Sequence, residues 1–222
     1  MHTLHDAAAV LRAHPDYAAP QAKTTVIPNG IELNRFASDR ERQPAILVVA
    51  RLFDRKGVQH VLEALRDRNY PFTVHIVGDG PARADLERLA SASKTPVRFW
   101  GWLDNGSEQL QELLETSQIF VYPSTQENFP VALLEAMAAG LAIVTTVGTG
   151  CDEVVGDSAV LVRPGNSGDI RAALDRLTAD PGLRAAKAAA ALARLRSSFG
   201  WQAIARRYRE LLLPECKTVG SA

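Results

Sequence analysis

Short apolar runs alternate with helical patterns along most of this chain. The run AILVVA at positions 45–50 is apolar throughout, which is typical of a strand buried on both faces. Further strands are expected at 73–77, 96–100, 118–122, 141–145 and 159–162. Helices are expected at 58–68, 81–92, 107–115 and 131–139, and then near 167–179, 182–197 and 201–213.

This strict alternation of strands and helices predicts an α/β fold. The sheet is expected to be parallel, with right-handed crossovers that place helices on both faces. We predict a doubly wound, Rossmann-like sheet of about six strands in the order 3-2-1-4-5-6, with extra C-terminal helices. Upstream, a short helix is expected at 4–13, a short strand at 24–27 and a linker at 31–44.

Composition narrows the class of protein without naming a function. Of the 222 residues, 46% are hydrophobic and 23% are charged, which is ordinary for a globular chain, and a formal net charge of zero argues against a nucleic-acid partner. Two cysteines make no disulfide framework. No run is long enough to span a bilayer, and the start does not look like a signal peptide. We expect a soluble, cytoplasmic protein, with contact to a membrane surface left open.

Two glutamates eight positions apart are the first candidates for chemistry. Glu127 follows the strand at 118–122, and Pro130 is expected to open the helix that carries Glu135 about two turns in. Loops at the carboxyl ends of strands bind ligands in such sheets. Paired carboxylates there suit a polyol, because their oxygens accept from neighbouring hydroxyls. Alternatively, Glu127 is an ordinary acid at the N-terminus of the helix and Glu135 an acid on the helix surface, because two glutamates at this spacing often occur by chance.

A second candidate site follows the first strand. Arg51 and Lys56 both lie between this strand and the next helix, whose N-terminus adds positive potential. Two cations and a helix dipole favour a diphosphate ligand. The alternative interpretation is a pair of solvated loop charges.

The glycine-rich turn at 78–83 argues against a nicotinamide-dependent enzyme. Arg83 stands where a dinucleotide fingerprint has its third glycine, and the turn follows the second strand instead of the first. Gly78 either lets the backbone approach a ligand or simply makes the turn. After the third strand, Trp102 is either a core residue or a ring that stacks on a base.

Other residues carry weaker signals. The five histidines show no ligand spacing and there is no Asp-x-Asp pair, so we predict no metal site. The basic cluster at 206–209 is either a solvated helix face or a contact for acidic lipid or another domain. Cys151 is more typical of a small buried residue than of a nucleophile.

Taken in order, these motifs resemble the C-terminal, donor-binding domain of the retaining GT-B glycosyltransferases of family four. The resemblance covers about residues 24–213. Its ordered motifs are VIPNGI at 26–31, VAR at 49–51, KG at 56–57, IVGDGP at 76–81, Gly101, YPS at 122–124, ENFP at 127–130, LEAMAAG at 134–140 and EVV at 153–155. The family more usually has paired glycines where Thr149 stands.

The resemblance implies a role for each matching position. Arg51 and Lys56 are expected to grip the diphosphate of a nucleotide sugar, Glu127 to contact the sugar, and Glu135 to hold the ribose. The donor-binding set is completed by Gly78, by Gly101, Trp102 and Leu103 near the base, and by Asn128, Phe129, Pro130 and Val131 in the acidic loop. Phe129 and Val131 can offer backbone amides, which Pro130 lacks.

The resemblance also implies a mechanism and a division of the chain. Positive charge on Arg51 and Lys56 replaces a metal as the diphosphate leaves, and losing one such group costs roughly 10²–10³ in rate. Residues 1–28 correspond to the end of an acceptor-binding N-terminal domain with its linker, 29–200 to the donor-binding domain, 201–213 to a helix that crosses back, and 214–222 to a tail. The isolated chain is expected to be inactive or nearly so, with no cofactor beyond its nucleotide-sugar substrate.

Alternatives remain open at this stage. A non-catalytic nucleotide-sugar binding subunit, partnered in trans, has the same sequence features as a donor half. A different Rossmann-like enzyme, such as an epimerase or dehydrogenase, conflicts with the missing glycine fingerprint. We also expect an exposed apolar patch beside the last helix, which self-association would cover, and peripheral membrane contact is left open for a full-length enzyme.

Overall fold

The sheet has the order that the alternating pattern predicts. The structure is a computed structural model, and it describes residues 25–36 and 40–213. Six strands pair in the order β3-β2-β1-β4-β5-β6, and every neighbouring pair is parallel. They are β1 (Ala45–Val49), β2 (Thr73–Val77), β3 (Val97–Gly101), β4 (Ile119–Tyr122), β5 (Ala142–Thr146) and β6 (Val160–Val162). The doubly wound α/β fold is therefore confirmed.

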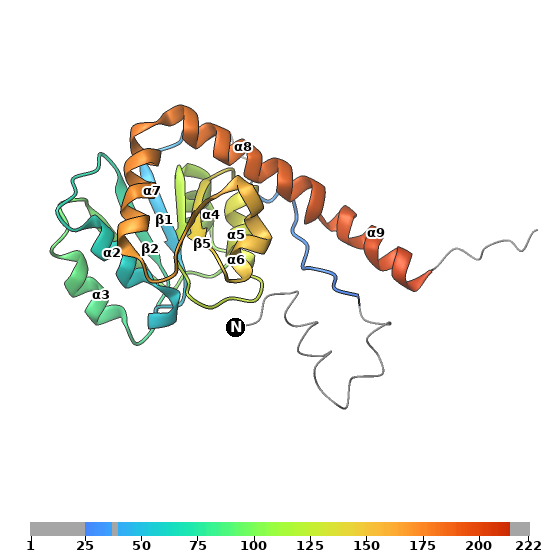
Figure 1. Cartoon of the computed structure of the whole chain (residues 1–222), viewed down its shortest axis with the longest axis horizontal. Coiled ribbons are helices and arrows are strands. Elements are labelled where there is room, and N and C mark those ends of the chain that lie inside the picture. The colour runs from blue at the N-terminus through green and yellow to red at the C-terminus, as the bar shows by residue number, and fades with distance from the viewer. Residues whose placement is uncertain (1–24, 37–39, 214–222) are drawn as a thin grey trace, which may run out of the picture.

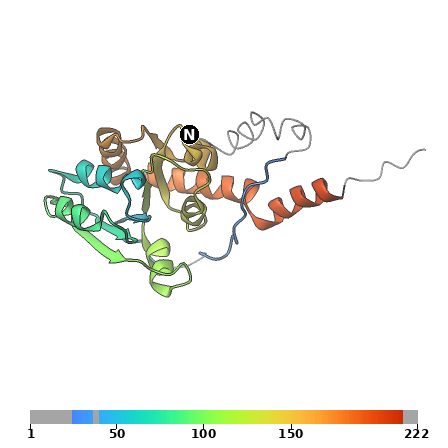
Figure 2. The same cartoon turned by 90° about the horizontal axis from the view of Figure 1, so that it is seen from below.

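Helices cover both faces of this sheet (Figures 1 and 2). One face packs on α2 (Val58–Leu65), α3 (Arg83–Ala90) and α7 (Ser167–Ala179). The other packs on α4 (Glu108–Thr116), α5 (Val131–Ala138), α6 (Gly150–Val155) and α8 (Pro181–Ser198). Each face has its own buried hydrophobic cluster, and β1, β4 and β5 contribute side chains to both. Because the central strands are buried on both sides, their sequences are continuously apolar.

Local sequence explains where the helices begin. The side chain of Ser107 accepts a hydrogen bond from the Leu110 amide and caps α4. Asp180 caps α8 in the same way, with Pro181 as the first helical residue. Two 3-10 turns are also present: η3 (Asp54–Lys56) follows β1, and η4 (Gly156–Ser158) follows α6.

Two glycines allow the loops that follow β1, β2 and β4 to approach closely. Gly57 has φ +72°, and a Cβ atom there would lie 2.2 Å from the Pro123 carbonyl oxygen. Gly78 has φ +133°, and its Cβ would lie 1.9 Å from the Ala50 carbonyl oxygen. A side chain at either position would collide with backbone and force a disfavoured φ. Both glycines therefore shape the carboxyl edge of the sheet.

Some local expectations were wrong. Residues 25–27 form no strand; the nearest pairing is an isolated bridge between Ile31 and Gly200. The helix predicted at 58–68 ends earlier, at Leu65, and Asp67 then adopts a left-handed φ of 62°. Tertiary pairing near Arg66, which bridges to Ser93, replaces the last helical turn. The helix expected at 4–13 lies outside the described residues.

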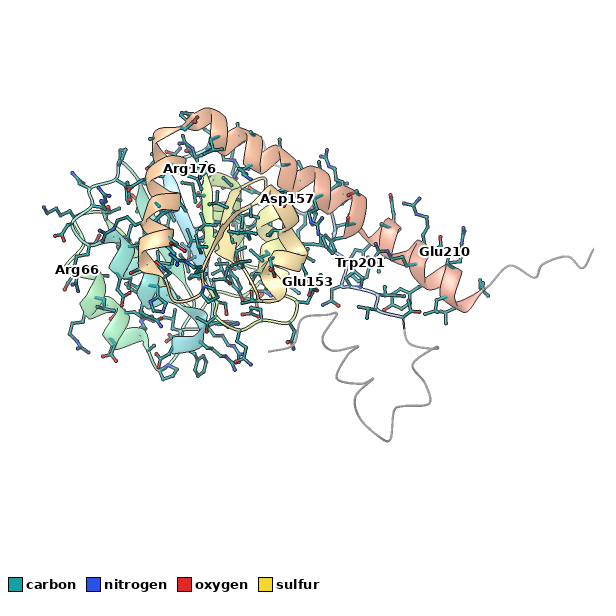
Figure 3. All side chains as sticks on the ribbon, in the orientation of Figure 1. Arg66, Glu153, Asp157, Arg176, Trp201 and Glu210 are labelled. Atoms are coloured by element: carbon teal, nitrogen blue, oxygen red, sulfur yellow. The ribbon has the colours of Figure 1, made fainter. Side chains whose placement is uncertain are left out.

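The last helix extends away from the sheet. Figures 1 and 3 show α9 (Trp201–Leu212) continuing beyond α8, with segment 25–36 alongside its start. Ile204 is buried, while a stripe of larger side chains is exposed: Trp201, Tyr208, Leu211, Leu212 and Leu213. The expected apolar patch is therefore present, and self-association through it stays a prediction. Within the described residues, no helix is both long and apolar enough to cross a membrane.

Candidate functional site

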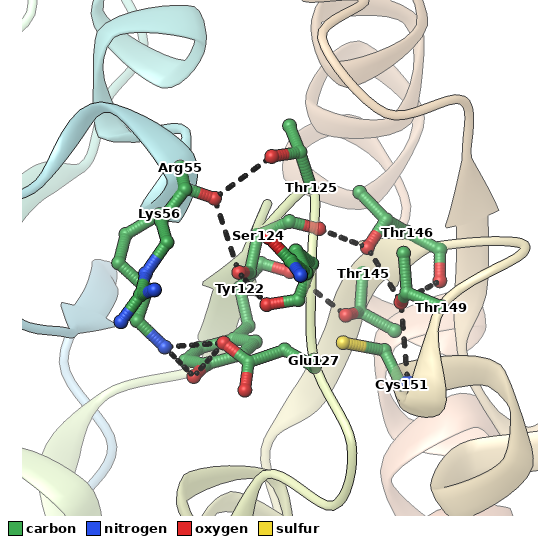
Figure 4. Close-up of polar contacts among 11 residues, drawn as sticks. Arg55, Lys56, Tyr122, Ser124, Thr125, Glu127, Thr145, Thr146, Thr149 and Cys151 are labelled. Atoms are coloured by element: carbon green, nitrogen blue, oxygen red, sulfur yellow. Dashed lines mark hydrogen bonds and ion pairs between the residues drawn. The ribbon is translucent and has the colours of Figure 1, made fainter. Parts of the chain in front are cut away.

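The loops that follow β1, β4 and β5 meet at the carboxyl edge of the sheet (Figure 4). The carbonyl oxygen of Arg55, in η3, accepts a hydrogen bond from the Thr125 amide at 2.8 Å. The carbonyl oxygen of Glu127 accepts one from the Gly150 amide at the start of α6, at 3.0 Å. Backbone contacts thus fix these three loops relative to one another.

Lys56 and Glu127 form an ion pair across this junction. Their side chains are each 12% exposed, and Lys56 Nζ donates to Glu127 Oε1. Tyr122, the last residue of β4, donates its hydroxyl to the same Oε1 at 2.9 Å and lies 3.3 Å from Lys56 Nζ. Two residues that the sequence predicted for the site are therefore in direct contact, and a tyrosine joins them.

Tyr122 is a site residue that the sequence analysis did not single out. Burial and the neighbouring Glu127 carboxylate raise the pKa of its hydroxyl. The hydroxyl therefore keeps its proton at neutral pH and acts as a donor. The available signal was a phenol at the end of a buried strand, five residues before the acid.

Arg51 lies at the same edge but remains exposed. Its guanidinium stacks over the Phe53 ring, 5.6 Å from the centroid. Its positive charge also opposes the rise in the Tyr122 pKa, which indicates that it acts on the same cluster. Among residues 25–36 and 40–213, Arg51 has no ion-pair partner. It is thus a cation available to an anionic ligand.

Glu135 occupies a different environment from Glu127. It is the fifth residue of α5, little more than one turn into the helix, so the expected depth of two turns was wrong. The helix starts only at Val131, after an extended Pro130. Burial raises the pKa of the Glu135 carboxyl, and Arg35 at 3.7 Å only partly opposes this.

Arg35 links Glu135 to the loop after β3. Besides the contact to Glu135, its guanidinium donates to the carbonyl oxygen of Asn105. Because Arg35 precedes Glu135 by a hundred positions, no local pattern in the sequence could have paired them. The arginine is the second site residue that sequence reasoning missed.

The remaining predicted residues line the same edge. Trp102 is 68% exposed, which rules out the alternative that it is a core residue, while Leu103 packs against the core. The Gly101 carbonyl oxygen accepts from the Gly78 amide at 2.7 Å, so these glycines join β2 to β3. A packing requirement thus accounts for Gly78 without a ligand.

In the acidic loop, some residues face inward and some outward. The Phe129 ring lies edge-on to Phe199, 5.8 Å between centroids, and Pro130 is buried. Val131 is 44% exposed. The Asn128 carbonyl lies where any Cβ on Gly150 would collide with it, 1.9 Å away.

Thr149, which stands where the family that the sequence resembles more usually has a glycine, caps a helix. It is buried, and its hydroxyl accepts from the Cys151 amide at 3.2 Å, which caps α6. Cys151 is fully buried and burial raises the pKa of its thiol, so it is not a reactive thiolate. The described part of the chain has no cluster of three metal-ligating His, Cys, Asp or Glu side chains.

Comparison with known proteins identifies the family. The family model for "Glycosyl transferases group 1" matches residues 30–194, and the chain belongs to this family. It is 37% identical over 195 residues to a glycogen synthase of Mycobacterium tuberculosis, covering 83% of this chain and 47% of that protein. It is 32% identical to the putative colanic acid biosynthesis glycosyltransferase WcaL of Escherichia coli, covering 72% and 42%. The chain thus spans about half the length of these relatives.

Solved structures agree on the fold, that of the C-terminal domain of a GT-B glycosyltransferase. Anabaena HepE in complex with UDP and glucose superposes with a TM-score of 0.77 at 22% identity, covering 88% of this chain and 58% of that one. The C-terminal domain of a group 1 glycosyl transferase (LpcC) from Francisella tularensis has a TM-score of 0.67 at 24% identity, covering 77% and 99%.

Proposed function

We propose that this chain is the donor-binding half of a retaining, metal-independent hexosyltransferase. It takes a hexosyl group from a nucleoside-diphosphate sugar and passes it to a glycan or lipid-linked acceptor. The observation that carries the proposal is the Lys56–Tyr122–Glu127 cluster beside the exposed cation of Arg51, at the ligand-binding edge of the sheet. The presence of UDP and glucose in the HepE structure supports a nucleotide-sugar ligand.

In this proposal, the two cations receive the diphosphate. Arg51 is exposed over Phe53 and offers a planar set of donors, and Lys56 stands in η3 just before the N-terminus of α2. As the bond to the anomeric carbon breaks, negative charge grows on the leaving diphosphate. Fixed positive groups stabilise that charge most when they are already in place. This assignment requires no metal and no cofactor apart from the substrate.

The two acids then bind neutral parts of the donor. Glu127 accepts from hydroxyls of the transferred sugar, and Glu135 accepts from the ribose. Glu135 is suited to this because a buried, incompletely paired carboxylate gains most from new donors. The base lies near Gly101, Trp102 and Leu103, where the exposed indole can stack.

Retention follows from attack on the same face of the sugar that the diphosphate leaves. Glu127 is held by Lys56 and Tyr122 through one oxygen, which favours a positioning role over that of a covalent nucleophile. A nucleophile needs freedom to approach the anomeric carbon.

The proposal includes an acceptor-binding half, on the same polypeptide or on a separate chain. The relatives are about twice the length of the aligned chain. Residues 1–28 and the exposed stripe of α9 are the parts proposed to join that half. Transfer measured before and after adding a candidate acceptor-binding half separates this enzyme from a subunit that only binds nucleotide sugars.

A thermal-shift panel of nucleoside diphosphates and their sugars tests the donor site. At least one ligand is expected to raise the melting temperature, since binding to the folded state stabilises it. Arg51→Ala, Lys56→Ala and Glu135→Ala are each expected to reduce that shift. Arg55→Ala is the matched control, a neighbouring exposed cation in the same turn. No hit in the panel, or a shift indifferent to all three changes, contradicts the assignment.

A further inference from the structure

Glu127 presents its two carboxylate oxygens to different surroundings. Lys56 Nζ and the Tyr122 hydroxyl both donate to Oε1. Figure 4 shows these contacts converging on one oxygen, with the other pointing away from them. No donor from residues 25–36 or 40–213 reaches Oε2. One oxygen is thus saturated, and the other is left to accept from something else.

Of the two donors, the tyrosine is the more rigid. Tyr122 is 5% exposed, ends β4, and its ring is stacked on Phe120 at an interplanar angle of 9°. Burial and the Glu127 carboxylate raise the pKa of its hydroxyl, so the proton is retained. Lys56 reaches the carboxylate through a flexible four-carbon chain from a three-residue turn.

Lys56 is charged and Tyr122 is neutral, so a bound diphosphate would affect the two donors differently. A diphosphate in the proposed site competes with Glu127 for the Lys56 ammonium, because an ammonium is attracted to any nearby anion. The Tyr122 hydroxyl is neutral, so the diphosphate attracts it much less strongly than it attracts the ammonium. When Lys56 turns to the ligand, only the tyrosine keeps Oε1 in place.

We infer that Tyr122 is a positioning residue that holds Glu127 by Oε1, so that Oε2 faces a hydroxyl of the donor sugar. This inference rests on the proposed function and deepens it, because it names the atom that meets the sugar. It also predicts that Tyr122 affects recognition of the sugar and leaves recognition of the nucleotide unchanged.

Calorimetry with UDP, ADP, GDP and their glucose conjugates tests the inference. The quantity of interest is the ratio of Kd for the diphosphate to Kd for its sugar conjugate, measured with the best-bound base. Tyr122→Phe is expected to lower this ratio about tenfold, the size of a hydrogen bond to a charged group. Its Kd for the bare diphosphate should stay within about twofold of the wild type.

Tyr70→Phe is the matched control. Tyr70 is buried, and its hydroxyl donates to the Asp175 carboxylate at 2.6 Å, so the change removes the same kind of bond elsewhere. It should lower the melting temperature and leave the ratio unchanged. A ratio that falls equally in both variants points to general loosening of the fold and overturns the inference.

A double variant separates positioning from direct contact. In a Glu127→Ala background, Tyr122→Phe should have no further effect on the ratio, because the residue it positions is gone. A further, additive loss overturns the inference, as does an unchanged ratio in Tyr122→Phe alone. If the wild type binds a diphosphate but prefers no sugar conjugate, the inference fails while the nucleotide site stands. If it binds neither, the proposed function fails first.

Discussion

Two tyrosines in this protein make the same kind of cluster at opposite edges of the sheet. Before β2, Tyr70 donates to Oδ1 of Asp175 at 2.6 Å, and Arg68 donates to Oδ2 at 2.8 Å. After β4, Tyr122 and Lys56 both donate to Oε1 of Glu127. Each cluster thus combines a phenol, a cation and a carboxylate.

The difference lies in how the carboxylate is used. Each oxygen of Asp175 accepts from a different donor, so both oxygens have a partner within the fold. These contacts join the segment before β2 to α7. Glu127 receives both donors on one oxygen, although its side chain is 12% exposed against 38% for Asp175. The second oxygen of Glu127 has no hydrogen-bond partner among the described residues, so a ligand or water can donate to it. The first cluster thus uses both carboxylate oxygens within the fold, whereas the second leaves one oxygen for the ligand that we propose.

The largest expected effect comes from removing Lys56, the cation of the Glu127 cluster, and the matched change is removal of Arg68, the cation of the Asp175 cluster. Lys56→Ala should weaken binding of the best nucleoside diphosphate roughly 10–100-fold, because a charge-assisted contact is lost. Arg68→Ala should leave that affinity within about twofold, since Arg68 lies at the other edge. Isothermal titration calorimetry measures both. Equal losses would break the distinction between the clusters.

For stability the order of the two clusters should reverse: removing Asp175 should lower the free energy of unfolding more than removing Glu127. Asp175→Ala strands the Tyr70 hydroxyl and Arg68, and should lower the free energy of unfolding by about 2 kcal/mol. Glu127→Ala should cost less than about 1 kcal/mol, because the Lys56 ammonium can turn to solvent on its flexible chain once the acid is gone. Urea denaturation followed by circular dichroism gives both values. A larger loss for Glu127→Ala would contradict a ligand-directed role.

Glu135 extends the comparison to a buried acid whose carboxylate contacts an arginine, Arg35, and no tyrosine among the described residues. Burial raises the pKa of its carboxyl, so the folded protein binds this proton more tightly than the unfolded chain does. The stability that this tighter binding gives is fully present below the ordinary value of 4.5 and is lost as pH rises through the folded pKa. Glu135→Gln should therefore melt about 1–3 °C above the wild type at pH 7, with the gain vanishing near pH 4. Exposed Glu210→Gln should show no such trend in differential scanning fluorimetry.

An exposed pair provides the smallest effect. Asp169 accepts from Arg163 at 2.7 and 2.8 Å, and these bonds lower the pKa of Asp169 to about 2. Its contribution is present above the ordinary value of 3.8 and is lost as pH falls through about 2. Asp169→Asn should shift the melting temperature at pH 7 by no more than about 2 °C, because exposed pairs are weak. A larger shift would show that burial is not what separates these clusters.

Much of the fold was predictable because its information is local. Buried parallel strands must be continuously apolar, and the helices between them must have an apolar stripe. Segment 45–50 could therefore be predicted as a strand, and segment 131–139 as a helix, from the pattern alone. The right-handed crossover then left few strand orders to consider. The short strand expected at 24–27 is not formed by its described residues, 25–27, because an apolar run without a neighbouring strand has nothing to pair with.

The candidate site was predictable only in part. Arg51, Lys56 and Glu127 stand just after strands, where ligands bind, so their positions alone pointed to them. Tyr122 looked like another strand residue, and Arg35 lies in a segment that no local pattern connects with Glu135. Trp102 could have been core or surface, and only packing placed it in solvent.

The sequence by itself therefore determined the alternating architecture, the family, and which charges stand at strand ends, because period and position are properties of neighbouring residues. Only the tertiary structure decided that Lys56 and Tyr122 share one oxygen of Glu127 while Arg68 and Tyr70 divide the two oxygens of Asp175. Those contacts join residues up to 107 positions apart. Their geometry depends on how loops from different strands converge, which no stretch of sequence contains.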